Sequence, residues 1–307
     1  MTGTSKYKLN HTMLRVKNPE ASVKFYKQLG MSVLQEFRFP DFKLDLYFLA
    51  YDNQGSVSQG RHMSDREGVI ELSYNYDVER THNGNMDPKG FGHICVSVYD
   101  LESACDRLSK AGFHHQQSQH GFTYVLDPDE YWVKLISQND AVTNPEPKTT
   151  NIEKYRFNHT MLRVKDKNAS LEYYQNVFGM MLHHTHHNLD QNYESFFLGY
   201  CKPKLGKEVS EPNPDPLQET LLELVYIPGS EEHVQYHNGN TDPEGFGHIC
   251  VSVDDIQEAC KRFEEKGVRW HKRLEDGPFR IAFIQDPDDY WIEIIQNESY
   301  KPAGHNM

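Results

Sequence analysis

The feature that most constrains this chain is a run of nine residues that occurs twice. The letters GFGHICVSV extend from Gly90 to Val98 and again from Gly245 to Val253. In each copy a histidine precedes an alternating apolar run, which predicts a half-buried strand with the histidine near its start. The glycine before each histidine lets the backbone approach a neighbour closely. An identical repeat of this length predicts two copies of one architecture.

Other motifs recur in the same order and extend the duplication over nearly the whole chain. NHTMLRVK begins at Asn10 and at Asn158, and HNGN begins at His82 and at His237. The pattern Asp-Pro-Asp-x-Tyr-Trp begins at Asp127 and at Asp286.

The chain has 307 residues, more than a single domain usually contains. We therefore predict one domain over residues 1–140 and a second over 155–307. Residues 141–154 are rich in Pro, Asn and Thr and are predicted to link the two. A Pro-rich polar insertion, 201–218, is predicted to be a surface loop of the second half.

Each half is predicted to contain two β-α-β-β-β units. In the first half, an amphipathic helix is predicted to end at Gly30, and a second is predicted to start after Asp100 and end at Gly112. The predicted strands are His11–Val16, Val33–Phe37, Leu44–Tyr51, Val69–Tyr74, His93–Val98, Thr123–Asp127 and Trp132–Ile136. Four such units in the whole chain predict an α+β fold.

Composition excludes several classes of function. The net charge of -13, without a basic stripe, argues against nucleic-acid binding. No apolar run is long enough to span a bilayer, and the N-terminus has no apolar signal core, so no membrane role is expected. The five cysteines include no Cys-x-x-Cys pair, and four of them recur at equivalent places. This repetition indicates small buried thiols, not disulfides. Free thiols favour a reducing compartment, which predicts a cytoplasmic protein.

Residues of the metal-binding type fall at matching places on the predicted strands. They are His11, Glu71, His93 and, at the fourth place, Lys134 in the first half, and His159, Glu223, His248 and Glu293 in the second. Each glutamate interrupts an apolar run, where an unpaired buried charge is costly. Two imidazoles with two carboxylates suit zinc, nickel, cobalt or iron. The pattern alone leaves open which of these residues converge, and any one of them could lie on a solvated strand face.

Taken together, the motifs resemble the glyoxalase I (lactoylglutathione lyase) family in its fused two-domain form. They are HTMLRV from His11, YFLAY from Tyr47, HNGN from His82, GFGH from Gly90, and DPDxYWIE from Asp286. The resemblance implies the vicinal-oxygen-chelate (VOC) fold, made of two tandem domains of paired βαβββ units. It also implies that each site is shared between the two halves.

Under that pairing, the resemblance implies two sites of unequal quality. The first has the metal ligands His11, Glu71, His248 and Glu293. The second has His159, Glu223, His93 and Lys134, and the lysine makes it degenerate. The family holds one divalent ion in such a site; zinc is favoured here over nickel, cobalt and iron.

The resemblance further implies the reaction. Family members isomerise the hemithioacetal of methylglyoxal and glutathione, a cosubstrate, to S-D-lactoylglutathione, and a metal-stabilised enediolate is the intermediate. Glu293 is implied as ligand and base, Arg15 and Asn75 as contacts to the glutamyl end of glutathione, and Lys272 as a contact to the glycyl carboxylate. Glu244 departs from the family, since many members have arginine there.

Three differences predict a single competent site per chain. Lys134 replaces the glutamate of the second site, Ile227 replaces its asparagine, and Gln116 and Gln117 stand near the place of the basic residue. We expect a monomer with pseudo-dimeric halves. Two other readings remain open: an extradiol dioxygenase of the same fold, and a non-catalytic protein that sequesters a thiol conjugate or a metal.

Overall fold

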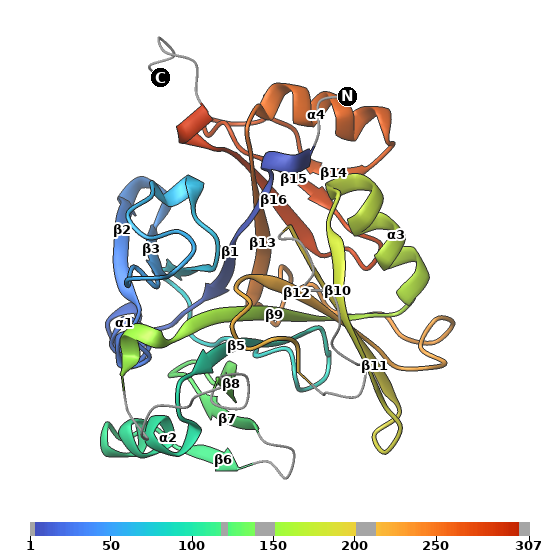
Figure 1. Cartoon of the computed structure of the whole chain (residues 1–307). Helices are drawn as coiled ribbons and strands as arrows, with labels where there is room; N and C mark the ends of the chain where they lie inside the picture. The colour runs from blue at the N-terminus through green and yellow to red at the C-terminus, as the bar shows by residue number, and fades with distance from the viewer. Residues whose placement is uncertain (1–3, 118–121, 139–150, 201–212, 301–307) are drawn as a thin grey trace.

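The computed structural model describes residues 4–117, 122–138, 151–200 and 213–300 (Figure 1). Each unit contributes one α-helix and four strands. The first unit comprises β1 (Lys8–Arg15), α1 (Pro19–Gln28), β2 (Ser32–Phe39), β3 (Leu44–Ala50) and β4 (Val69–Asn75). The second comprises β5 (Phe91–Val98), α2 (Leu101–Lys110), β6 (His115–Gln117), β7 (Phe122–Leu126) and β8 (Trp132–Ser137). The third comprises β9 (Arg156–Val164), α3 (Lys167–Phe178), β10 (Met181–Asn188), β11 (Tyr193–Gly199) and β12 (Leu221–Tyr226). The fourth comprises β13 (Phe246–Val253), α4 (Ile256–Glu265), β14 (Arg269–Lys272), β15 (Ala282–Gln285) and β16 (Trp291–Gln296).

The predicted α+β fold of four βαβββ units is confirmed. Strand β6 was not predicted, because three residues are too short for a periodic signal. The helix boundaries follow from local chemistry, since Asn or Asp caps the start of each of the four α-helices among the described residues. The predicted cap is among them: Asp100 accepts a hydrogen bond from the Ser103 backbone N–H at 2.8 Å. Gly30 follows the end of α1 with φ of 89°, a conformation that glycine adopts without strain.

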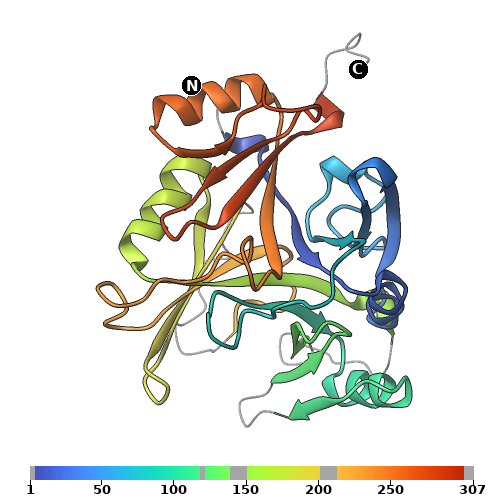
Figure 2. The same ribbon diagram turned by 180° about the vertical axis from the view of Figure 1, so that it is seen from behind.

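The strands form two eight-stranded sheets, and each sheet combines one unit from each half of the sequence. The first sheet has the order β14-β15-β16-β13-β1-β4-β3-β2, and the second has the order β10-β11-β12-β9-β5-β8-β7-β6. In Figure 1 the first sheet joins blue strands to orange and red ones, and the second joins green strands to yellow ones; Figure 2 shows the same crossing from behind. The central pairs, β1 with β13 and β5 with β9, are antiparallel.

The division into domains 1–140 and 155–307 stays a prediction, and both sheets cross it. Most of the predicted linker and of the predicted insertion at 201–218 lies outside the described residues. Within the linker, Ile152–Lys154 form a short 3-10 helix.

The repeated nonapeptide lies where the two sheets meet. The rings of Phe91 and Phe246 stack there, with centroids 5.1 Å apart and planes 8° apart. The hydroxyl oxygens of Thr12 and Thr160 are 2.6 Å apart. A Cβ atom on Gly245 would lie 1.8 Å from the carbonyl oxygen of His82, so only glycine fits at this contact.

One large apolar core runs through all four units. Helix α1 packs on β3 and β4, α2 on β8, α3 on β12 and α4 on β16. Among the described residues, no helix is both long and apolar enough to cross a lipid bilayer.

Candidate metal centre and its counterpart

Four predicted ligands, two from the first unit and two from the fourth, converge on the first sheet. His11 lies on β1, Glu71 on β4, His248 on β13 and Glu293 on β16. One donor atom of each lies within 4.8 Å of the donor atoms of the others. These four side chains form what we call the first centre.

The first centre is tightly spaced around the Nε2 atom of His11. That atom lies 3.0 Å from Oε2 of Glu71, 3.1 Å from Oε2 of Glu293 and 3.2 Å from Nε2 of His248. From Nε2 of His248, the distances to the same glutamate oxygens are 3.9 and 3.5 Å.

The donor set fits a divalent cation. All four residues are between 4 % and 7 % exposed. Within the described residues, neither Glu71 nor Glu293 forms an ion pair with a lysine or an arginine. Two buried carboxylates with no lysine or arginine beside them are costly, and a divalent ion between them would reduce that cost.

Asn10 orients His11, a role that sequence reasoning missed. Its amide nitrogen donates to the carbonyls of Met63 at 3.0 Å and Arg66 at 2.8 Å, which leaves its oxygen as an acceptor for His11 Nδ1 at 2.7 Å. Adjacent side chains on a regular strand point to opposite faces, but β1 has a register shift between Leu9 and Thr12 that lets these two meet. Nδ1 is therefore held against Asn10, and Nε2 is the nitrogen that faces the centre. The recurring Asn-His pair was the available signal.

The environment of the first centre favours positive charge. Burial lowers the pKa of His11, but contacts with Cys250, Glu293 and Glu71 outweigh it and hold that pKa well above its ordinary value. Burial raises the pKa of Glu293, but the imidazoles of His11 and His248 lower it by more, so Glu293 is ionised.

Three of the four predicted residues of the second site converge on the second sheet. His93 on β5, His159 on β9 and Glu223 on β12 form the second centre. His159 Nε2 lies 3.1 Å from both His93 Nε2 and Glu223 Oε2. Asn158 orients His159 at 2.7 Å as Asn10 orients His11.

Lys134 occupies on β8 the register position that Glu293 occupies on β16. It pairs across the sheet with Tyr124, as Glu293 pairs with Phe283. Its ammonium lies 4.6 Å from the centroid of the Phe122 ring, and the side chain is buried. Burial lowers the pKa of His93 to about 3, and the Lys134 charge adds to this effect against the opposing one of Glu223. The second centre therefore holds neutral imidazoles beside a built-in cation.

The predicted substrate contact Arg15 lies beside the first centre, but its guanidinium is engaged within the protein. It donates to the carbonyls of Gly239 and Gly245 and to the side chain of Asn240, at 3.1, 3.3 and 3.0 Å. Its Nε lies 3.4 Å from the carboxylate of Glu244, the residue noted above as a departure. These hydrogen bonds of Arg15 thus connect β1 to the loop that contains the second HNGN motif, at residues 237–240.

Arg163 makes the same contacts in the other half. It donates to the carbonyls of Gly84, Gly90 and Phe91 and to the side chain of Asn85, at 3.2, 3.2, 3.0 and 2.7 Å. The conserved geometry in both sheets indicates that each arginine at this position has a structural task besides any contact with substrate.

The other predicted contacts lie on the same sheet as the first centre. Asn75 is half-buried at the end of β4, four residues after Glu71 and hence on the same strand face. Lys272 ends β14, and its ammonium donates to the carbonyls of Phe279 and Ile281 at 3.1 and 2.6 Å. At the second centre, Ile227 is exposed and Gln116 lies on β6.

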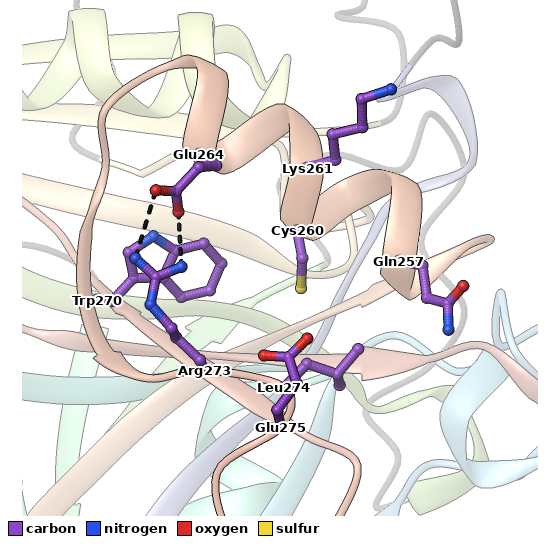
Figure 3. Close-up of a pocket in the computed structure, with 8 residues that line it drawn as sticks. All are labelled: Gln257, Cys260, Lys261, Glu264, Trp270, Arg273, Leu274 and Glu275. Carbon is purple, nitrogen blue, oxygen red and sulfur yellow. Dashed lines mark hydrogen bonds and ion pairs between the residues drawn. The ribbon is translucent and has the colours of Figure 1, made fainter.

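A surface hollow of about 330 Å³ lies away from both centres, along α4 (Figure 3). Arg273 and Glu264 face one another across it with hydrogen bonds of 2.7 and 3.4 Å, and the guanidinium lies 5.0 Å from the centroid of the Trp270 ring. Arg273 and Glu264 satisfy each other's charge, and we assign no chemistry to the hollow.

Comparison with known proteins agrees with the fold. The family model described as "Glyoxalase/Bleomycin resistance protein/Dioxygenase superfamily" matches residues 8–135 and 156–294. The crystal structure of glyoxalase I from Zea mays is similar, with a TM-score of 0.72 at 23% identity over 96% of this chain and 94% of that one. The chain is thus a tandem protein of the vicinal-oxygen-chelate fold.

Relatives that match over nearly their whole length define the class of enzyme more closely. The lactoylglutathione lyase of Schizosaccharomyces pombe is 40% identical, with 97% of this chain and 99% of the relative covered. The glyoxalase I of Saccharomyces cerevisiae is 37% identical, with 94% and 91% covered. The chain belongs to the glyoxalase I (lactoylglutathione lyase) family and is an enzyme of that class.

Proposed function

We propose that the first centre isomerises the hemithioacetal of methylglyoxal and glutathione to S-D-lactoylglutathione, in methylglyoxal detoxification. The observation that carries this proposal is the convergence of His11, Glu71, His248 and Glu293 within 4.8 Å in a chain of this family. The names of its full-length relatives support the same reaction.

His11, Glu71, His248 and Glu293 would hold one divalent ion, with zinc favoured and nickel, cobalt or iron as alternatives. Such an ion supplies Lewis-acid stabilisation of the negative charge that develops on the two neighbouring oxygens of the substrate. The protein fixes His11 for this task through Asn10, so the imidazole lone pair needs no reorientation.

Glu293 is the proposed general base. Proton removal from the carbon that bears sulfur needs a carboxylate close to the reacting atoms, and return of the proton to the neighbouring carbon needs the same group in its acid form. Glu293 is ionised, and its Oε2 lies 3.1 and 3.5 Å from the Nε2 atoms of His11 and His248. In the second centre Lys134 takes the place of Glu293, whereas Glu223 takes the place of Glu71. The two centres therefore differ at the position of the proposed base.

Arg15, Asn75 and Lys272 are the proposed contacts to glutathione. Because Arg15 is already engaged, a substrate carboxylate would compete with Glu244 for its Nε edge. Lys272 would offer its remaining N–H to the glycyl carboxylate while it holds the carbonyls of Phe279 and Ile281.

We also propose one competent site per chain, at the first centre, in a monomer with pseudo-dimeric halves. A cytoplasmic location is proposed from the free cysteines Cys95, Cys105, Cys250 and Cys260.

The direct test follows thioester absorbance when protein is mixed with methylglyoxal and glutathione. We expect a steady rise that a chelator abolishes and that added divalent metal restores. No rise with metal-replete protein would instead support the binding protein considered above. Product formation from a catechol under oxygen, without thioester, would support the extradiol dioxygenase.

A further inference from the structure

The strands that flank the two centres present inner faces of opposite character. Phe48 on β3 contacts His11, and Phe197 on β11 contacts His159, with ring centroids 5.7 and 5.1 Å apart, so both faces are defined by equivalent residues. Beside the first centre this face of β2 and β3 consists of Gln35, Phe37, Phe39, Leu44, Leu46 and Phe48. At the same register positions, β10 and β11 carry His184, His186, Asn188, Tyr193, Ser195 and Phe197.

On the other side of each centre, an apolar residue of the first sheet is likewise replaced by a polar one in the second. Phe283 lies at 5.2 Å from the ring of His248 in the first sheet, and Tyr124 takes its place at 5.6 Å from the ring of His93. Glu293 is replaced by Lys134 next to it. The second centre thus keeps three ligand-type residues but exchanges an apolar surrounding for a polar one.

His186 is a buried imidazole without a partner. It is 9 % exposed, and neither of its ring nitrogens has a hydrogen-bond partner among the described residues. It lies on the same strand face as His184, whose ring contacts Phe197 beside His159. Burial lowers the pKa of His186, and the charges of His184 and Lys134 lower it further while Glu223 opposes them. Its counterpart Phe37 needs no partner, so the polar atoms of His186 are a cost that a ligand could remove.

Lys134 is a buried cation without a paired anion. It is 6 % exposed, and no described carboxylate forms an ion pair with it. Relative to the first centre, the second has lost one negative charge and gained one positive charge. The carboxylate of Glu223 at the same centre attracts the Lys134 charge, but its ion-pair contacts are with His93 and His159. A buried ammonium without a direct ion pair is costly, and the ring of Phe122 offsets only part of that cost.

We propose that the second sheet binds a small molecule through an oxyanion group, a carboxylate or a phosphate, between Lys134, His186 and Tyr124. Lys134 supplies the counter-charge, and His186 and the Tyr124 hydroxyl each donate one hydrogen bond. Tyr124, Tyr193 and His184 are half-buried, so the face can be reached from solvent. This site is distinct from the first centre and does not depend on the reaction proposed there.

Trp132 offers a reporter that is specific for this site. Its ring lies 4.9 Å from the ring of Tyr124, and the other tryptophans, Trp270 and Trp291, belong to the first sheet. In a full-length Trp270→Phe, Trp291→Phe background, malonate and inorganic phosphate are titrated against Trp132 emission at constant ionic strength, with chloride as the control salt. We expect saturable quenching by malonate, phosphate or both, and none by chloride. The probe that binds with the lower dissociation constant indicates whether the site prefers a carboxylate or a phosphate.

Substitutions then test the assigned residues. Lys134→Met should weaken binding at least about tenfold, because the buried counter-charge is lost, and Lys134→Arg should retain most of it. His186→Phe, which restores the residue of the first centre, should weaken binding about three- to tenfold. Lys266→Met, at an exposed lysine after α4, is the matched control and should have no effect.

Two results would overturn the proposal: malonate and phosphate behaving like chloride, or Lys134→Met binding as tightly as the parent. If Lys134→Met fails to fold by circular dichroism, His186→Phe decides the question alone. Thioester formation at the first centre is measured separately, so a failure here leaves that proposal standing, and the reverse also holds.

Discussion

The side-chain oxygen of Asn10 lies 2.7 Å from Nδ1 of His11 and determines which nitrogen of that imidazole faces the other ligands. The contact joins neighbours in sequence that a regular strand would place on opposite faces. It therefore depends on the bulge in β1 as much as on the two residues.

Removing this contact should weaken metal binding. For Asn10→Ala we expect affinity for the tight metal ion to fall about 10- to 100-fold, because His11 loses its fixed tautomer and orientation. Competition with a chromophoric chelator measures it. Asn158→Ala removes the equivalent contact at His159 and should leave the tight ion in place; equal losses in both variants would contradict the assignment.

Replacing the proposed base should stop turnover without unfolding the protein. Glu293→Gln is isosteric, and we expect kcat to fall about 10²- to 10⁴-fold, the usual contribution of a general base. Initial rates of thioester formation measure the loss, and circular dichroism checks the fold. Lys134→Gln, at the same register position of the other sheet, should keep the parent rate. A Glu293→Gln variant with more than about a tenth of the parent rate would exclude Glu293 as the main base.

Substitutions of Arg15 and Arg163 can separate an effect on substrate binding from an effect on protein stability. Arg15→Ala should raise KM with a smaller change in kcat, because its contact is remote from the reacting carbons and similar in ground and transition states. It should also lower the melting temperature, since its hydrogen bonds to Gly239, Gly245 and Asn240 are lost.

Arg163→Ala removes the equivalent bonds at the second sheet. It should show a comparable shift in melting temperature with an unchanged KM. If both variants change KM alike, the effect of Arg15 is structural and its assignment to glutathione is wrong.

One working site predicts unequal effects of the two repeated histidines. His248→Ala should lose at least about 10²-fold in rate, whereas His93→Ala should stay within about twofold of the parent. Metal analysis after dialysis should find close to one tight ion per chain, and a chelator should remove it together with the activity. A halved rate in His93→Ala, or two equally tight ions, would show that the second centre also turns over.

The close approach of Gly245 to the carbonyl oxygen of His82 predicts that substituting this glycine destabilises the protein. Gly245→Ala would place a methyl group 1.8 Å from the His82 carbonyl oxygen, so the backbone must shift. We expect the free energy of unfolding to fall by about 2 kcal/mol or more. Urea denaturation measures this change, and a variant as stable as the parent would mean that the contact is loose.

The sequence by itself predicted the repeats, the four units and the approximate positions of seven of the eight strands in the first half. The reason is local: apolar alternation marks strands, and the Asp100 cap and Gly30 act on their own neighbours in the chain. The candidate ligands were visible for the same reason, because a glutamate such as Glu293 inside an apolar strand is conspicuous without any partner. Strand β6 was missed, since its three residues carry too little pattern.

Only the tertiary structure decided which of these residues meet. His11 and His248 are 237 positions apart, and their approach to 3.2 Å depends on β1 pairing with β13 across the two halves, which residue spacing leaves open. The engagement of Arg15 by Gly239 and Asn240, and the solitary burial of His186, likewise come from chain segments that meet only on folding. Sequence patterns record what each segment prefers locally, whereas a site is made by long-range strand pairing that brings separate segments to one place.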